Sequence, residues 1–139
     1  MHMLGDDPAA MQRDPVYGDV VGAVRVFLQE RLRVLQQAGV DPQRVVFDPG
    51  IGFGKTAEHN WQLMQRQSEL TDLGRPLLVG WSRKSTLGLL TGRAAEDRLA
   101  ASVAAALAAV QHGAQIVRVH DVAATVDALA VWRRSGLTA

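Results

Sequence analysis

Apolar strand-like runs alternate with helix-like segments along this chain, and that alternation limits its possible folds more than any other feature. The apolar runs cover residues 44–47, 77–81 and 115–119. Apolar residues at helical spacing predict helices over 20–38, 58–70, 86–90, 94–112 and 122–135, and residues 1–18 are predicted to be a loop. Because strands connected through helices run parallel with right-handed crossovers, the chain is predicted to be an α/β protein with three parallel strands.

The length of the chain limits how such a sheet can close. A barrel of eight strand–helix units needs about 250 residues, whereas this chain has 139. Three strands would also leave two edges without a neighbour. The pattern therefore indicates either a small open sheet or part of a larger structure.

Composition excludes several classes of function. The 15 Lys and Arg residues nearly balance the 14 Asp and Glu residues and form no basic tract, so nucleic acid is a poor candidate partner. The absence of cysteine excludes disulfides and thiolate metal sites and favours a cytoplasmic location. The four scattered histidines argue against a zinc site. No apolar run approaches the length of a membrane span, and the N-terminal residues lack the features of a signal peptide.

Polar side chains follow each of the three predicted strands. Asp48 and a run of glycines follow the first strand, the cluster Ser82-Arg83-Lys84 follows the second, and Arg118 and His120 lie at the end of the third. Because parallel strands end at one rim of a sheet, these groups are predicted to converge. A carboxylate can accept two hydrogen bonds from an amino-amide edge, and Arg and His can bind phosphate. The site is therefore predicted to bind a polar heterocycle that carries an anionic group.

Each of these groups also has an interpretation that involves no ligand. Asp48 can simply form a turn, the Arg83-Lys84 pair can be exposed, and His120-Asp121 can be only a helix cap. Lys55 is predicted to be a solvated loop residue. The other histidines are expected at surface or capping positions and the tryptophans in the core: His2, His59 and His112, and Trp61, Trp81 and Trp132. The functional interpretation is favoured because all three predicted strands end in charged groups.

Spacing excludes two nucleotide-binding motifs. Gly54-Lys55-Thr56 resembles the end of a phosphate-binding P-loop, but that motif needs glycine at position 49, where this chain has Pro49. Gly50, Gly52 and Gly54 have the spacing G-x-G-x-G, whereas dinucleotide-binding folds use G-x-G-x-x-G.

Four segments resemble dihydropteroate synthase of folate biosynthesis, in the same order and at similar spacing. They are Met1-His2-Met3-Leu4-Gly5, Asp48-Pro49-Gly50-Ile51-Gly52-Phe53-Gly54-Lys55, Leu78-Val79-Gly80-Trp81-Ser82-Arg83-Lys84-Ser85 and Arg118-Val119-His120-Asp121-Val122. The second and third segments are specific to that family, and the fourth is short. The resemblance implies a TIM barrel of eight strand–helix units, of which residues 1–139 would form the C-terminal part, with the barrel incomplete.

The resemblance also implies a reaction and a pterin pocket. Enzymes of this family join 6-hydroxymethyl-7,8-dihydropterin pyrophosphate to p-aminobenzoate and release pyrophosphate, and sulfonamides compete for their aminobenzoate site. By resemblance, Asp48 holds the amino-amide edge of the pterin. Phe53, carried on a flexible glycine wall, and Gly80 line the pocket, and Lys84 hydrogen-bonds the pterin ring beside the aminobenzoate.

The remaining residues of the resemblance are assigned to the second substrate and the leaving group. Ser82, at the start of a helix, would receive the aminobenzoate carboxylate. Arg118 and His120 would bind the pyrophosphate and stabilise its charge as it departs in an SN1-like displacement. Lys84, Arg118 and His120 are thus the expected catalytic residues, and the expected small-molecule partners are the pterin pyrophosphate and p-aminobenzoate.

The resemblance covers only the C-terminal half of the family. The other half would supply the Asn that meets the pyrophosphate and metal, so Mg²⁺ is an expected cofactor for which this chain provides no ligand. The chain alone is expected to be inactive and to self-associate, while homodimers would form through the C-terminal helices at full length. The alternatives are a non-catalytic pterin-binding or assembly remnant, and a corrinoid-dependent methyltransferase barrel, against which the cluster at 82–84 argues.

Overall fold

The computed structural model describes residues 1–5, 11 and 14–136, so the predicted loop at 1–18 lies partly outside the described residues. Within these residues the helices and strands follow in the order α1 (Val20–Gln37), α2 (Ala57–Gln65), α3 (Ser68–Thr71), β1 (Leu78–Val79), α4 (Ser85–Thr91), α5 (Leu99–Gln111), β2 (Ile116–Val117) and α6 (Val122–Arg134). Two short 3-10 turns, η1 (Pro42–Arg44) and η2 (Ala95–Asp97), lie between them. The predicted α/β class is confirmed.

The strands run parallel, as predicted, but they are much shorter than the predicted runs. β1 pairs with β2 in the register Leu78 with Ile116, and Phe47 joins Leu77 through a single parallel bridge. The predicted strand at 44–47 is wrong in extent because η1 occupies its beginning, where the N–H of Val45 donates to the carbonyl of Pro42. Pro76 has no N–H to donate, but its carbonyl accepts the N–H of Phe47 at 2.8 Å.

One backbone hydrogen bond joins the N-terminal segment to the chain around Asp48. The N–H of His2 donates to the carbonyl of Asp48 at 3.0 Å, on the side of that segment away from β1. In space, the segments follow one another as 2, 47–48, 77–79 and 116–118.

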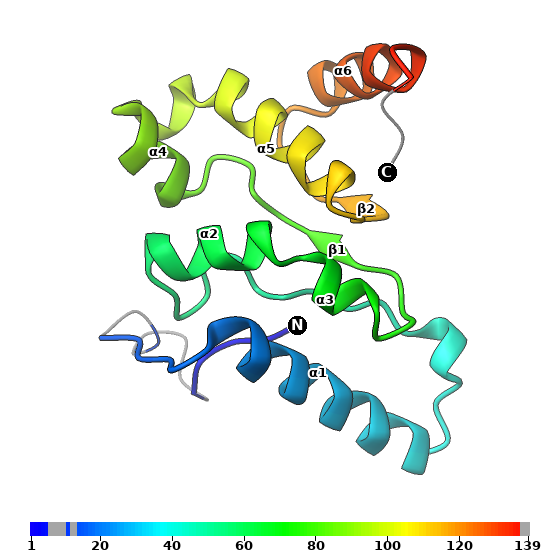
Figure 1. Ribbon diagram of the computed structural model, residues 1–139. Coiled ribbons are helices and arrows are strands. Elements are labelled where there is room, and N and C mark those ends of the chain that lie inside the picture. Colours follow the sequence, from blue (N-terminus) through cyan, green and yellow to red (C-terminus); the bar gives the residue numbers. More distant parts are fainter. Residues whose placement is uncertain (6–10, 12–13, 137–139) are drawn as a thin grey trace.

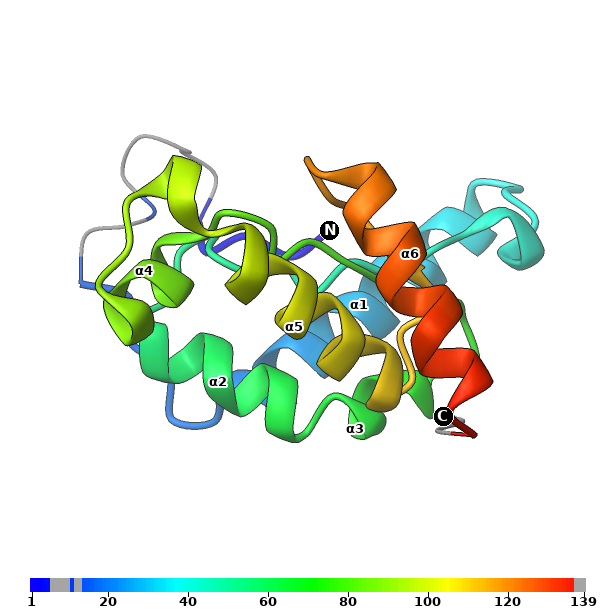
Figure 2. The ribbon, with the colours of Figure 1, turned by 90° about the horizontal axis from the view of Figure 1, so that it is seen from above.

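The helices pack against one another and around these segments in nearly chain order. α1 contacts α2 and α3, α2 contacts α4, α4 contacts α5, and α5 contacts α6. In Figure 1 this arrangement extends from α1 at the bottom to α6 at the top, with β1 and β2 between them. Seen from above, α5 and α6 lie side by side, and α4 sits at the end of α2 (Figure 2). No helix within the described part of the chain is long and apolar enough to cross a membrane.

The ends of α1 follow the sequence signals closely. Asp19 is the N-cap, and its carboxylate accepts the N–H of Val21 at 3.1 Å. At the other end, Gly39 has φ +82°, the N–H of Gly39 donates to Gln36, and the N–H of Val40 donates to Leu35. This pair of bonds is a Schellman motif, so the predicted glycine stop is confirmed.

Two of the predicted helices differ from the structure in extent. The predicted helix at 58–70 breaks between α2 and α3, where the side chain of Gln67 turns into the core and donates to the carbonyls of Ala109 and His112 at 2.8 and 3.0 Å. The predicted helix at 94–112 begins only at Leu99, after η2. Its alanines pack closely, as expected: Ala109 is fully buried, and Ala105 and Ala106 are nearly so.

The core gathers residues from α1, α2 and the strands. Its members include Val24, Leu28, Phe47, Leu63, Leu70, Leu77, Val79 and Trp81. Trp81 is buried and stacks on Trp61, with ring centroids 5.1 Å apart. The core prediction is confirmed for Trp81 and for Trp61, which packs against the core, whereas Trp132 on α6 is only half-buried.

A stability prediction comes from the N-terminus of α2. There, Thr56 accepts the N–H of His59 and the ring of His59 accepts the N–H of Thr56, both at 3.2 Å, which confirms the predicted capping role of His59. We expect Thr56→Ala to lower the free energy of unfolding by about 1 kcal/mol in urea titrations, and Thr56→Ser, which keeps the hydroxyl, to change it by much less. Equal losses in the two variants would contradict the capping interpretation.

Candidate functional site

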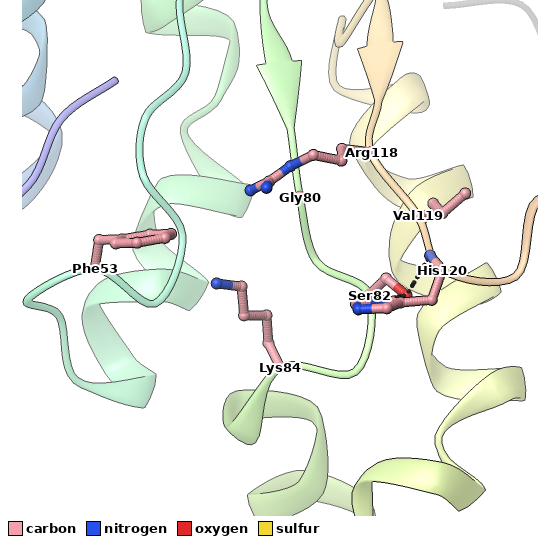
Figure 3. A pocket seen from close by; sticks show the side chains of 7 residues that line it. All are labelled: Phe53, Gly80, Ser82, Lys84, Arg118, Val119 and His120. Carbon is pink, nitrogen blue, oxygen red and sulfur yellow. Dashed lines mark hydrogen bonds between the residues drawn. The ribbon is translucent and has the colours of Figure 1, made fainter.

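A pocket of about 270 Å³ lies where β1 and β2 end. It is lined by Phe53, Gly80, Ser82, Lys84, Arg118, Val119 and His120. Figure 3 shows Phe53, Lys84 and Arg118 pointing toward the same space from three different segments of the chain. The predicted convergence is therefore present in the structure. Val119 was not predicted, and Asp48, which was predicted, is not among the lining residues.

Ser82 and His120 form one side of the pocket together. The N–H of His120 donates to the hydroxyl oxygen of Ser82 at 3.2 Å, and Nδ1 of His120 lies 2.9 Å from the same oxygen. Because the hydroxyl already accepts the backbone N–H, its own proton can be donated to Nδ1. Ser82 is buried and fixes the orientation of the imidazole, which is itself exposed (Figure 3).

The prediction that Ser82 begins a helix is wrong. Helix α4 begins at Ser85, with Lys84 at its N-cap position. Arg83 between them has φ +59°, a left-handed conformation that is costly for a residue with a Cβ. Its N–H donates to Ser102 at 3.0 Å, and its guanidinium donates to Asp121 at 2.9 Å. These bonds hold the turn that separates Ser82 from Lys84.

The contact between Asp121 and Arg83 bears on the interpretation in which His120-Asp121 is only a helix cap. Asp121 occupies the N-cap position of α6, as expected, but its carboxylate accepts hydrogen bonds from Arg83. Of the predicted exposed pair, Arg83 is exposed and Lys84 is half-buried and turned into the pocket. Arg83 therefore holds the turn through Asp121, and Lys84 reaches the pocket.

Lys84 lies between an aromatic ring and another cation. Its Nζ is 4.4 Å from the centroid of the Phe53 ring, within the range of a cation–π interaction. The stem of Lys84 lies against the glycine loop, residues 50–54, so closely that a Cβ at Gly52 would lie 3.1 Å from Cδ of Lys84. Burial lowers the pKa of Lys84, the neighbouring Arg118 lowers it further, and Asp48 opposes this shift. An anionic ligand would relieve this crowding of positive charge.

Arg118 comes from the end of β2 and crosses the backbone of the neighbouring segment. A Cβ at Gly80 would lie 3.0 Å from Nη2 of Arg118, so the missing side chain at position 80 makes room for the guanidinium. Its N–H continues the ladder by donating to the carbonyl of Val79 at 3.0 Å. Arg118 therefore reaches the pocket from a backbone that the sheet holds in place.

Asp48 forms the turn that one interpretation of the sequence predicted. Its Oδ1 accepts the N–H of Gly50 at 2.7 Å. This contact uses one of two carboxylate oxygens, so it is compatible with ligand binding. The charge of Asp48 acts on both lysines, because it raises the pKa of Lys55 and of Lys84.

Lys55 and His2 are buried, and the predictions that placed them in solvent are wrong. The Nζ of Lys55 donates to the carbonyls of Gly50 and Phe53 at 2.9 and 3.0 Å and lies 2.9 Å from Nδ1 of His2. Burial lowers the pKa of Lys55 to about 7, with a further lowering from Lys84. Burial and the charge of Lys55 lower the pKa of His2 to about 4. The sequence signal that could have indicated the burial of Lys55 is its place directly after glycines, whose carbonyls need hydrogen-bond donors.

The glycine loop is held by side chains, which argues against the predicted flexible wall. Besides the two bonds from Lys55, the N–H of Gly52 donates to Asn60 at 2.9 Å, and the hydroxyl of Tyr17 donates to the carbonyl of Gly54 at 2.9 Å. Gly50 has φ +70°, and a Cβ there would collide with the carbonyl of His2. Glycine therefore serves close packing and backbone conformation at this position.

The described residues do not by themselves fit a magnesium site. They contain no group of three or more His, Asp or Glu side chains close enough to hold a metal ion. Among the residues that line the pocket, Lys84 and Arg118 are cations and none is Asp or Glu, whereas a hard divalent cation prefers carboxylate and carbonyl oxygens.

Comparison with known proteins places the chain in a class. The sequence pattern of the family described as pterin binding enzyme matches residues 1–120, and the chain belongs to this family. It is 55% identical to dihydropteroate synthase of Neisseria meningitidis serogroup B over an alignment of 141 positions, and 47% identical to that of Haemophilus influenzae over an alignment of 133 positions. These alignments cover 99% and 96% of this chain but 49% and 48% of the relatives, so the chain spans about half their length.

Solved structures agree with the sequence comparison. Dihydropteroate synthase of Stenotrophomonas maltophilia superposes with a TM-score of 0.94 at 53% identity, covering 97% of this chain and 51% of that one. The enzyme of Xanthomonas albilineans in complex with 7,8-dihydropteroate gives 0.86 at 52% identity, covering 88% and 47%. The resemblance found in the four sequence segments is thus confirmed.

The shifted pKa of Lys55 leads to a prediction about pH. The folded-state pKa of about 7 lies below the ordinary 10.5, so between these values the folded chain binds fewer protons than the unfolded chain. The free energy of unfolding is therefore expected to rise as the pH increases from about 7 toward 10, and Lys55→Met should lose most of this rise. Urea titrations at several pH values measure it, with Arg134→Met, at an exposed position near the end of α6, as the control that keeps the rise. An unchanged slope in Lys55→Met would contradict the assignment.

Proposed function

We propose that this chain forms part of a dihydropteroate synthase, which condenses 6-hydroxymethyl-7,8-dihydropterin pyrophosphate with p-aminobenzoate to give 7,8-dihydropteroate and pyrophosphate in folate biosynthesis. The observation that carries the proposal is the meeting of Phe53, Lys84, Arg118 and His120 in one pocket at the ends of parallel strands. Relatives of about 50% identity support it, because their structures contain 7,8-dihydropteroate or 4-aminobenzoic acid.

The charges of the pocket suit the two halves of the pterin substrate. Arg118 and His120, on one side, offer donors to the pyrophosphate. Asp48 would accept hydrogen bonds from the amino-amide edge of the pterin, and Phe53 would pack on its ring. Lys84 lies between these groups, where it can donate to the ring. Each of these side chains is assigned one role, and the missing side chain at Gly80 leaves the space that Arg118 crosses.

The reaction requires separation of charge, which these residues can stabilise. The bond between the pterin methylene carbon and the pyrophosphate oxygen breaks, and the bonding electrons leave with pyrophosphate. The aniline nitrogen then forms a bond to the same carbon and loses a proton. Arg118 and His120 would stabilise the negative charge that develops on the departing oxygen. Ser82 would orient His120 through the bonds described above and would lie beside the aminobenzoate carboxylate.

The architecture that fits this proposal is a TIM barrel to which residues 1–139 contribute the C-terminal part. The helices that follow one another around parallel segments agree with such a portion. The remaining strands would come from residues outside this chain, as would the ligands of Mg²⁺, which the proposal includes as the cofactor of the complete enzyme. The proposal also includes a homodimer through the C-terminal helices, which is supported by two exposed valines one helical turn apart on α6, Val122 and Val126.

A non-catalytic pterin-binding or assembly remnant is the second candidate. It is favoured by the pocket itself, because Phe53, Lys84 and Arg118 meet within this chain alone and could bind a pterin without turnover. Because both candidates predict little turnover from the chain alone, size-exclusion chromatography and a titration with the pterin separate them. The purified 139-residue chain is expected to show little turnover alone. A remnant without function would in addition show no affinity for the pterin.

The binding prediction separates the pyrophosphate from the pterin ring. Arg118→Ala is expected to weaken binding of 6-hydroxymethyl-7,8-dihydropterin pyrophosphate by about 10- to 100-fold, because charge-assisted hydrogen bonds are lost. Binding of 6-hydroxymethyl-7,8-dihydropterin, which lacks the pyrophosphate, should change by no more than about twofold. Isothermal titration calorimetry measures both ligands.

The control is Arg134→Ala, at an exposed position near the end of α6. It should leave the affinities for both ligands unchanged. Equal weakening of both ligands by Arg118→Ala would contradict the assigned role of Arg118. Absence of binding of either ligand to the unmodified chain would contradict the proposed function as it applies to this chain.

A further inference from the structure

We propose that Asn60 is a positioning residue that sets the distance between Phe53 and Lys84 in the pocket. Asn60 lies on α2, outside the pocket lining, and none of the sequence motifs pointed to it. The inference rests on the proposed function only for the identity of the ligand. Its geometric part stands on the contacts of Asn60 alone.

A single buried side chain connects two separate segments of the site. Asn60 is 1% exposed. Its Oδ1 accepts the N–H of Gly52 in the glycine loop at 2.9 Å, and its Nδ2 donates to the hydroxyl of Thr86 on α4 at 2.9 Å. Thr86 is also buried, at 2% exposure. The amide of Asn60 therefore holds the loop on one side and the beginning of α4 on the other.

The two segments that Asn60 joins carry the two sides of the pocket. Gly52 directly precedes Phe53, and Thr86 follows Lys84 by two residues. Across this junction the stem of Lys84 lies against Gly52, and Nζ of Lys84 is 4.4 Å from the centroid of Phe53. A displacement of the loop relative to α4 would change that distance directly. Asn60 is thus placed to fix the width of the pocket where a flat ring would enter.

The chemistry of the site explains why an amide is required. A backbone N–H can only donate, so the oxygen of the amide must face Gly52 and its nitrogen must face Thr86. One planar group then satisfies a donor on one segment and an acceptor on the other. Leucine at position 60 would fill a similar volume but would leave the buried N–H of Gly52 without the bond that Asn60 supplies. Such a loss should loosen the loop.

Gln67 provides a matched control for a purely structural role. It is likewise a buried amide, 1% exposed, and it donates to the carbonyls of Ala109 and His112 at 2.8 and 3.0 Å. Neither partner lines the pocket. Gln67→Leu should therefore destabilise the fold in the same way as Asn60→Leu without changing the distance between Phe53 and Lys84.

The experiment compares Asn60→Leu, Thr86→Val and Gln67→Leu in the full 139-residue chain. Thr86→Val removes one hydroxyl and keeps the shape, so it remains informative if Asn60→Leu does not fold. The first readout is hydrogen exchange of the amides of Gly52 and Phe53, compared with global unfolding measured in urea. The second readout is calorimetric binding of 6-hydroxymethyl-7,8-dihydropterin and, separately, of inorganic pyrophosphate.

Asn60→Leu and Thr86→Val are expected to speed exchange at Gly52 and Phe53, while Gln67→Leu leaves exchange there at the rate that its global stability sets. Asn60→Leu should weaken the pterin by about tenfold and Thr86→Val by about threefold, with pyrophosphate changed by less than about twofold. Equal effects of Gln67→Leu and Asn60→Leu on both readouts would overturn the positioning role. A parallel fall of pterin and pyrophosphate affinity in Asn60→Leu would also overturn it.

The two proposals fail in different ways. If the unmodified chain binds neither ligand, the proposed function fails for this chain, and the exchange rates of Gly52 and Phe53 still decide the role of Asn60. If the unmodified chain binds the pterin but the exchange and affinity of Asn60→Leu match those of Gln67→Leu, the positioning role fails and the proposed function stands.

Discussion

The hydrogen bonds between parallel segments determine where every group of the candidate site can lie. Leu78 donates to the carbonyl of Phe47, Arg118 donates to Val79, and His2 donates to Asp48. Because the segments run in the same direction, the residues that follow them emerge at the same end. Side chains that are tens of residues apart in the sequence thereby meet around one pocket of about 270 Å³. The helices bury the apolar residues of these segments and hold the arrangement together.

This convergence concentrates positive charge, and the structure compensates for it only in part. Lys84 and Arg118 line the same pocket, while the carboxylate of Asp121 is bound by Arg83. Burial and Arg118 both lower the pKa of Lys84, so the cation is less stable there than in water. A ligand that carries a pyrophosphate would supply the missing negative charge and would strengthen these contacts in a partly buried site. The same electrostatic cost therefore favours an anionic ligand over an uncharged one.

The sequence predicted the positions of the strands and the residues of the pocket because both depend on simple regularities. An apolar run followed by polar residues marks a strand end, and parallel topology brings such ends together. The break at Gln67 and the burial of His2, Lys55 and Asn60 could not be predicted in this way. Each depends on the path that a loop takes in space, and a polar side chain enters the interior only where backbone groups offer it partners. The sequence overestimated the strand at 44–47 because η1 occupies the beginning of that run.

The glycine loop explains why these unpredicted residues matter for the site. A loop with glycine at alternate positions gains access to conformations with positive φ, but it also loses more entropy on folding than other sequences do. Its carbonyls and N–H groups point in several directions and need partners that no strand or helix provides. Lys55 donates to two of the carbonyls, Asn60 accepts the N–H of Gly52, and Tyr17 donates to the carbonyl of Gly54. With these bonds in place, the aromatic ring of Phe53 is held 4.4 Å from the cation of Lys84 before any ligand arrives.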